Sequence, residues 1–120
     1  MQTDSEDRIQ QQIVQWYTNT YCLKHHNPRY LILSIPNGGS RNAIEATHLK
    51  ATGLLPGASD LIVVHGPVVL WVEVKTPTGK QSEVQLEFQK RVVSLGYEYV
   101  IVRSLEDFKQ LINKKILNFL

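Results

Sequence analysis

The sequence predicts an α/β fold, a small mixed β-sheet flanked by helices. Short apolar runs rich in Val and Ile alternate with longer segments whose apolar residues recur at helical spacing. Two of these runs are joined by a tight Gly-Pro turn, which is typical of a β-hairpin. A helical segment separates the second run from a last apolar run, which indicates a parallel crossover.

Composition sets broad limits on what the chain is. A length of 120 residues predicts a single domain over 1–120 with a substantial core. The net charge of +2 permits a nucleic-acid partner without requiring one. The single cysteine, Cys22, excludes an internal disulfide and fits a reducing compartment. No apolar run is long enough for a bilayer and the start lacks a signal-peptide pattern, so we expect a cytoplasmic protein that binds no membrane.

The first predicted helix begins at a capping box formed by Thr3 and Glu6 and continues to about Leu23. Its inward stripe, read from helical spacing, is Ile9, Ile13, Trp16 or Tyr17, and Tyr21. Glu6 lies on the same side as this stripe. It is therefore either a capping residue or a polar group that the helix turns toward a functional site, and both interpretations fit the sequence.

A strand and a second helix follow the first helix. The strand is predicted over Tyr30–Ile35 and the helix over Arg41–Thr52. Ser40 is expected to cap this helix and Gly53 to end it. The region therefore adds one strand to the sheet and one helix, for which we predict no buried face.

The chain is organised around the predicted hairpin, whose two strands lie within 57–64 and 68–75. Asp60 opens the first apolar run, and Glu73 and Lys75 close the second. Because strand side chains alternate between faces, Glu73 and Lys75 point the same way. Antiparallel pairing would bring Asp60 near both of them.

Two carboxylates in one small space repel each other, so the arrangement calls for a cation. Lys75 supplies one, and a divalent metal would supply more charge. The alternative is an exposed strand end that carries an ordinary Glu-X-Lys pair. The continuously apolar run Val68–Val72 favours a strand covered on both faces, and with Asp60 at the matching end it favours a site.

A second capping box, formed by Ser82 and Gln85, begins a helix that continues to about Leu95. Its predicted buried stripe is Val84, Phe88, Val92 and Leu95. Gln85 is explained as a capping partner. Its amide is also close enough in sequence to reach the Glu73–Lys75 strand end or a bound phosphate, so both roles remain open.

A final strand is predicted over Tyr97–Arg103, parallel to the second hairpin strand. Ser104 then caps a closing helix that continues to about Phe119. Its predicted inward face is Leu105, Phe108, Ile112, Ile116 and Phe119. Arg103 ends the strand on the side of Lys75, where it would bind a phosphate or pair with a carboxylate.

The order αβαββαβα, together with a short motif, resembles the PD-(D/E)XK nuclease superfamily and its restriction-endonuclease-like core. The motif is Gly57-Ala58-Ser59-Asp60, twelve residues, then Glu73-Val74-Lys75, and later Gln85. Within this superfamily the sequence resembles more closely the VRR-NUC domain, from the first helix to Phe108. The length is similar to that of the stand-alone members from phages and bacteria, which resemble Holliday-junction resolvases.

The sequence departs from the family pattern in two places. Ser59 stands where a proline usually precedes the aspartate, a position that mainly shapes the turn. Val102-Arg103-Ser104 stands where the Val-Arg-Arg signature is expected, so the second arginine is missing. The second departure bears on the family label more than on the catalytic residues.

The resemblance implies a Mg²⁺ site, with Mn²⁺ as a substitute, formed by Asp60, Glu73 and the backbone carbonyl of Val74. It implies that Lys75 lies beside the scissile phosphate and that Glu6 is a further ligand by position. Gln85 corresponds to the family's helix glutamine. The implied catalytic set is Asp60, Glu73, Lys75 and Gln85.

The implied function is a Mg²⁺-dependent DNA endonuclease that selects branched substrates such as four-way junctions. Two symmetric cuts in a junction would require a homodimer, and a phage-encoded member would act in the host cytoplasm. Expected nucleic-acid contacts are Arg41, Lys50, Lys80 and Arg103. The alternatives are a nuclease for flaps, ends or plain duplex, and a non-catalytic DNA-binding module on the same fold. A more distant alternative is a metal-binding protein that uses His25, His26 and Glu6.

Overall fold

A computed structural model of the protein describes residues 5–23, 29–35 and 43–119. The elements are α1 (Glu6–Tyr17), the π-helical turn η1 (Thr18–Leu23), β1 (Tyr30–Ser34), α2 (Ala43–Ala51), β2 (Leu61–His65), β3 (Val68–Val74), α3 (Glu83–Ser94), β4 (Glu98–Val102) and α4 (Leu105–Phe119). Their order confirms the predicted one. The addition is η1, which forms the last part of the first predicted helix.

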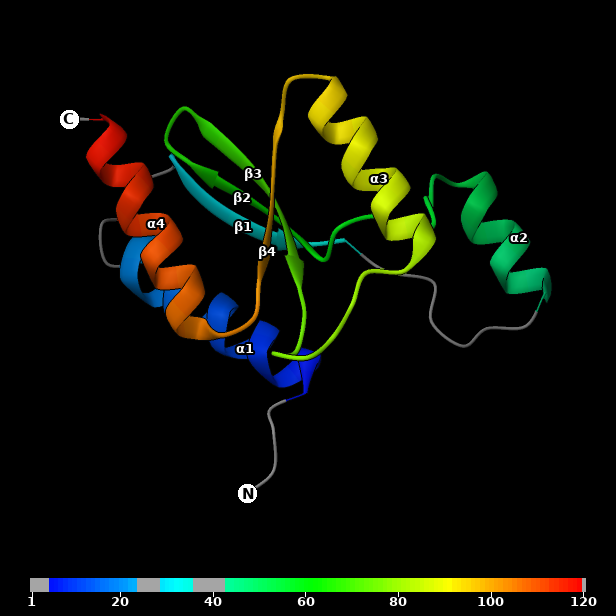
Figure 1. Ribbon diagram of the computed structural model, residues 1–120, viewed down its shortest axis with the longest axis horizontal. Helices are drawn as coiled ribbons and strands as arrows, with labels where there is room; N and C mark the ends of the chain where they lie inside the picture. The colour runs from blue at the N-terminus through cyan, green and yellow to red at the C-terminus, as the bar shows by residue number, and fades with distance from the viewer. Residues whose placement is uncertain (1–4, 24–28, 36–42, 120) are drawn as a thin grey trace.

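The four strands form one mixed sheet in the order β1-β2-β3-β4 (Figure 1). Strands β1, β2 and β3 pair antiparallel, and β4 pairs parallel to β3. The predicted hairpin and the predicted crossover are therefore both confirmed. Gly66 adopts a φ of 62°, a value that two-residue hairpin turns require and that glycine adopts without strain.

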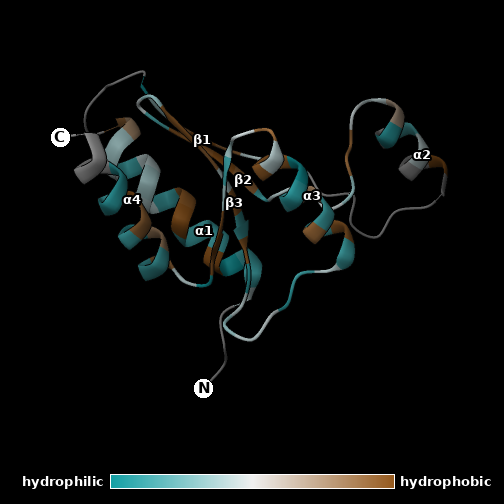
Figure 2. Cartoon of the chain, turned by 45° about the horizontal axis from the view of Figure 1, so that its top comes forward, coloured by the Kyte–Doolittle hydropathy of each residue, from teal (hydrophilic) through white to brown (hydrophobic). Residues whose placement is uncertain are grey.

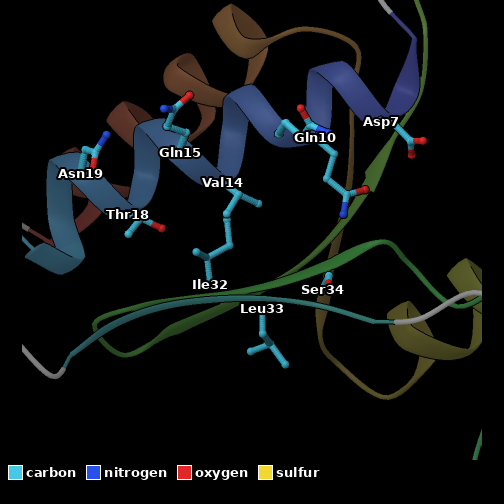
Figure 3. A pocket seen from close by; sticks show the side chains of 10 residues that line it. Asp7, Gln10, Val14, Gln15, Thr18, Asn19, Ile32, Leu33 and Ser34 are labelled. Carbon is cyan, nitrogen blue, oxygen red and sulfur yellow. The ribbon is translucent and has the colours of Figure 1, made fainter.

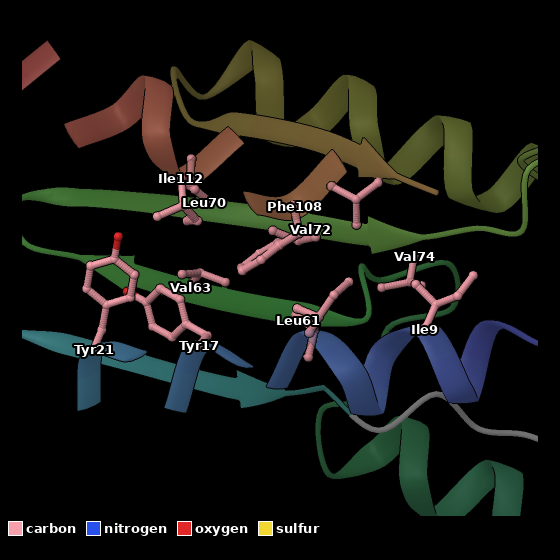
Figure 4. Close-up of a cluster of buried hydrophobic side chains, with 12 residues drawn as sticks. Ile9, Tyr17, Tyr21, Leu61, Val63, Leu70, Val72, Val74, Phe108 and Ile112 are labelled. Atoms are coloured by element: carbon pink, nitrogen blue, oxygen red, sulfur yellow. The ribbon is translucent and has the colours of Figure 1, made fainter. Parts of the chain in front are cut away.

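Helices α1 and α4 cover one face of the sheet, and the main core lies between them and the strands (Figure 4). The strands are the most hydrophobic part of the chain in Figure 2. The buried side chains of this core include Ile9, Ile13, Tyr17, Leu61, Val63, Leu70, Val72, Phe108 and Ile112. Tyr17 is fully buried and Trp16 only partly, which decides between the two candidates for the stripe of α1.

Helix α3 covers the opposite face, where Phe88 and Val92 pack with Tyr99 and Trp71. The prediction that Val84 and Leu95 complete this stripe is wrong, since they are 50% and 71% exposed. The reason is that α3 contacts the sheet through its middle turns, so apolar residues near its two ends extend beyond the packed surface.

The start of α1 differs from the predicted capping box. Ser5 is the N-cap, and its hydroxyl accepts a hydrogen bond from the backbone N–H of Arg8 at 3.2 Å. Thr3 lies outside the described residues. Glu6 is consequently the first helical residue rather than the third, so it does not occupy the reciprocating position of a capping box.

Other predicted ends are confirmed or lie outside the described residues. Gly53 follows α2 with a φ of 112°, the expected helix-ending conformation, and Ser104 caps α4 by accepting from the N–H of Asp107. Ser40 is outside the described ranges, as are the side chains of Ile116 and Phe119. No helix in the described part of the chain is long and apolar enough to cross a membrane.

Candidate active site

The three residues singled out in the hairpin meet at one end of the sheet. Leu61 pairs with Val72, so Asp60, one residue earlier, lies opposite Glu73. The carboxylate of Asp60 accepts a hydrogen bond from the N–H of Val74 at 2.7 Å, which fixes it against the end of β3. Glu73 is 1% exposed and Lys75 is 7% exposed, so both charged groups are buried.

Glu73 is held at both carboxylate oxygens. Gln85 Nε2 donates to its Oε1 at 3.2 Å. The hydroxyl of Tyr99, on the neighbouring strand β4, donates to its Oε2 at 3.2 Å. These contacts hold the carboxylate in one orientation beside Asp60.

Gln85 combines the two roles that the sequence left open. Its Oε1 accepts from the backbone N–H of Ser82 at 2.8 Å, which completes the capping box of α3. The same oxygen accepts from Lys75 Nζ at 2.9 Å. One side chain therefore begins the helix and links the Lys75 ammonium to the Glu73 carboxylate.

Gly57 explains how the start of β2 comes so close to the start of α3. It has a φ of 81°, and a Cβ at this position would lie 2.3 Å from the carbonyl oxygen of Val84. A side chain is therefore excluded by both backbone conformation and space. The loop that leads to Asp60 can pass directly over the first turn of α3, where Gln85 is located.

Glu6 also reaches the site from the start of α1. Its Oε1 lies 3.7 Å from Lys75 Nζ, and its side chain is 50% exposed. With Ser5 as the cap, the capping explanation for Glu6 no longer holds. Its contact with Lys75 places it beside the carboxylate pair, as its position on the first helix predicts.

Burial and repulsion from Asp60 raise the pKa of Glu73 from an ordinary value of 4.5 to about 8. The Lys75 ammonium and the hydrogen bond from Tyr99 act in the opposite direction without cancelling this shift. Burial of Glu73 and the nearby charge of Asp60 therefore outweigh the compensation from the surrounding groups. A bound cation would relieve this repulsion.

We expect the stability of the metal-free protein to fall as the pH rises through about 8. Folded Glu73 holds a proton that the unfolded chain releases near pH 4.5, so its stabilising contribution is complete below that value and is lost through about 8. The free energy of unfolding should drop by about 1 kcal/mol between roughly pH 7 and pH 9. Urea unfolding at both pH values measures it, and Glu73→Gln should abolish this part of the slope.

The donor set of the site is compatible with Mg²⁺. No three His, Cys, Asp or Glu side chains within 5–23, 29–35 and 43–119 form a group that could hold a metal by themselves. Mg²⁺, however, keeps several waters and is commonly bound through one or two carboxylates. Asp60 and Glu73 supply these, and the repulsion between them is the feature of this structure that favours a cation. His25 and His26 lie outside the described residues.

Arg103 has partners other than those predicted for it. Its Nη1 donates to the carbonyl oxygens of Thr76 and Gly79, each at 2.7 Å. These residues belong to the loop after β3 that carries the exposed Lys80. Arg103 therefore uses Nη1 to hold a loop next to the candidate site.

Of the other predicted nucleic-acid contacts, the structure describes Lys50 and Lys80. Lys50 is exposed on α2, which lies beyond α3 and away from the sheet (Figure 1). Arg41 is outside the described ranges. Among the four predicted contacts, Lys80 is the exposed residue nearest in sequence to Lys75.

Sequence reasoning missed Tyr99 and Gln81. Gln81 Nε2 donates to the Tyr99 hydroxyl at 3.2 Å and to Gln89 Oε1 at 2.9 Å. The available signal was the parallel pairing of β3 and β4, in which Tyr99 lies two positions before the partner of Glu73, on the same face. A residue with a polar end at that register would have been a candidate.

A large cavity, of about 660 Å³, lies between α1 and the edge strand β1, and its lining includes none of Asp60, Glu73 and Lys75 (Figure 3). Its polar lining consists mainly of neutral side chains such as Gln10 and Ser34, with Asp7 as a charged member. A phosphodiester backbone requires cationic groups. The cavity is therefore a poor path for DNA, and the chemistry remains with the buried carboxylate pair.

Solved structures with the same fold are known. One, described as "VRR_NUC domain protein", superimposes with a TM-score of 0.73 at 20% identity, covering 95% of this chain and 89% of that one. Another, described as "VRR_NUC domain", gives 0.62 at 20% identity, covering 92% and 97%. The chain therefore has the fold of VRR-NUC domains, as the sequence motifs predicted. No family model matches the sequence. The search of curated proteins found no match either.

Proposed function

We propose that the protein is a Mg²⁺-dependent deoxyribonuclease that hydrolyses phosphodiester bonds in branched DNA. The observation that carries the proposal is the meeting of half-buried Asp60 with buried Glu73 and Lys75 in one hydrogen-bonded cluster on a VRR-NUC fold. The sequence resemblance assigns these same positions to nuclease chemistry.

Each residue of the cluster has a defined task in this mechanism. Asp60, Glu73 and the carbonyl of Val74 would hold the ion. Glu6, whose Oε1 lies 3.7 Å from Lys75 Nζ, would be a further ligand or a partner of the ammonium. When bound, Mg²⁺ supplies an activated water and offsets negative charge on the phosphodiester. Mn²⁺ is expected to substitute.

Lys75 acts by electrostatics in this proposal. Its ammonium is anchored by Gln85 Oε1 and flanked by Glu6, so its direction is set before DNA binds. A preorganised positive charge stabilises the negative charge that develops at the phosphate. A buried ammonium held between acceptors is suited to this role more than to removing a proton.

Symmetric cleavage of a junction would require two copies of the chain. Exposed apolar residues of the first or last helix are candidates for the contact surface. Leu23, 58% exposed at the end of η1, is one such residue. Within the described ranges the other large exposed apolar side chains lie elsewhere, for example Leu31 and Leu33 on β1 and Leu86 and Val93 on α3.

Cleavage of labelled DNA tests the proposed function. We expect cutting of a four-way junction with MgCl₂ or MnCl₂ and none with EDTA, and weaker cutting of flap, linear duplex and single-stranded DNA. Preferential cutting of a flap or an end would mean that the protein is a nuclease with that substrate and not one for branched DNA. If the protein binds DNA but cuts none of these substrates under any of these conditions, it is a DNA-binding module and not an enzyme.

A further inference from the structure

Tyr99 places a hydroxyl where apolar packing alone would not. It is 8% exposed on β4, paired in register with Trp71 and in contact with the ring of Phe88. A buried hydroxyl without a partner is costly, so its hydrogen bonds identify what the position requires. Those bonds, both 3.2 Å long, join it to Glu73 Oε2 and Gln81 Nε2.

The donors and acceptors allow one direction for this chain of hydrogen bonds. A carboxylate that holds a metal is ionised and only accepts, so in that state the Tyr99 hydrogen is directed at Glu73. An amide nitrogen only donates, so the Tyr99 oxygen accepts from Gln81, whose second hydrogen goes to Gln89 on α3. Gln81, itself bonded to Gln89 on α3, thus sets the orientation of the Tyr99 hydroxyl, and the hydroxyl donates to the Glu73 carboxylate.

We propose that Tyr99 is a positioning residue of the metal site, which fixes the Glu73 carboxylate through its hydroxyl and is itself fixed by Gln81. The inference rests on the proposed function. Gln85 already holds Glu73 Oε1, so Tyr99 supplies the second point that sets the plane of the carboxylate beside Asp60. A ligand oriented in advance binds a metal more tightly, because less side-chain freedom is lost on binding.

The test is the variant Tyr99→Phe, which removes one oxygen and keeps the ring packing. Mn²⁺ binding by the purified full chain, measured by calorimetry, should be at least about tenfold weaker than in the wild type. Tyr97→Phe is the matched control: it is the same change two residues away, on a side chain that is 55% exposed. It should bind Mn²⁺ as the wild type does.

A second variant protects the test against a folding defect. Gln81→Leu leaves Tyr99 in place and removes the group that orients its hydroxyl. It should weaken Mn²⁺ binding in the same direction and by less. The melting temperature of each metal-free variant is measured beside the binding constant.

The outcomes are distinguishable. A purely structural Tyr99 would lower the metal-free melting temperature and leave Mn²⁺ affinity unchanged in both variants, and this would overturn the inference alone. A wild-type protein that binds no Mn²⁺ would overturn the inference together with the proposed function. Weaker binding in Tyr99→Phe with normal binding in Tyr97→Phe supports it.

Discussion

Asp60→Asn should reduce DNA cleavage by about 10³-fold or more while leaving the protein folded. The substitution keeps an oxygen that can accept from the N–H of Val74, the 2.7 Å bond that fixes this position. It removes one of the two negative charges that would hold the metal. Loss of a group that stabilises developing charge typically costs 10²- to 10³-fold, and loss of the ion itself would add to this. Single-turnover cleavage of the labelled substrate measures the effect.

The same variant should be more stable than the wild type when metal is absent. Repulsion from Asp60 is one cause of the raised pKa of Glu73, so a neutral residue at 60 relieves it. At pH 8 we expect a gain of about 1 kcal/mol, or roughly 4 °C in melting temperature. Opposite signs for activity and stability are typical of a functional site, since a residue kept only for folding would lose both.

Asp107→Asn is the control for this experiment. Asp107 is an exposed aspartate whose carboxylate also accepts from a backbone N–H, that of Arg103, at 3.0 Å. It makes none of the contacts described for the carboxylate pair, so the same chemical change there should leave cleavage near the wild-type rate. Wild-type cleavage by Asp60→Asn would contradict the proposed metal site.

The hairpin shows why much of the site could be predicted from the sequence. Alternation along a strand places Glu73 and Lys75 on one face, and a short turn fixes the register that brings Asp60 to them. Both rules act over a few residues, so they can be read from local sequence. The capping box of Ser82 and Gln85 is equally local, and it is present as predicted.

The parts that failed depend on packing between distant segments. Tyr99 reaches Glu73 across 26 residues of sequence. Gly57 is required both by its positive φ and by the close approach of Val84, and local sequence does not reveal the second requirement. The exposure of Leu95 likewise follows from where α3 leaves the sheet. Periodicity within one element cannot reveal these relations.

Lys75→Met should lower the rate of the cleavage step by about 10²- to 10³-fold. Methionine matches the length of the lysine stem and suits a position that is 7% exposed, so the fold is expected to tolerate it. The ammonium that Gln85 Oε1 holds at 2.9 Å is lost, and with it the positive charge beside the phosphate. DNA binding in EDTA should change little, because one buried cation contributes little to long-range attraction.

Removal of this charge should also shift the pH at which metal binds. The Lys75 ammonium lowers the pKa of Glu73, so in Lys75→Met that pKa rises further and the carboxylate accepts a metal at higher pH than in the wild type. Mn²⁺ titrations between about pH 7 and pH 9 measure the shift. A Lys75→Met protein with the wild-type metal-binding profile and rate would contradict the electrostatic role of Lys75.

Lys80→Met separates catalysis from simple loss of positive charge. Lys80 is exposed in the loop that Arg103 holds through the carbonyl oxygens of Thr76 and Gly79. Its substitution should weaken DNA binding and reduce the salt dependence of binding by about one phosphate contact. The single-turnover rate at saturating enzyme should stay unchanged. Two lysines five residues apart would then differ in kind, since Lys75 acts on the reacting phosphate and Lys80 on the DNA backbone.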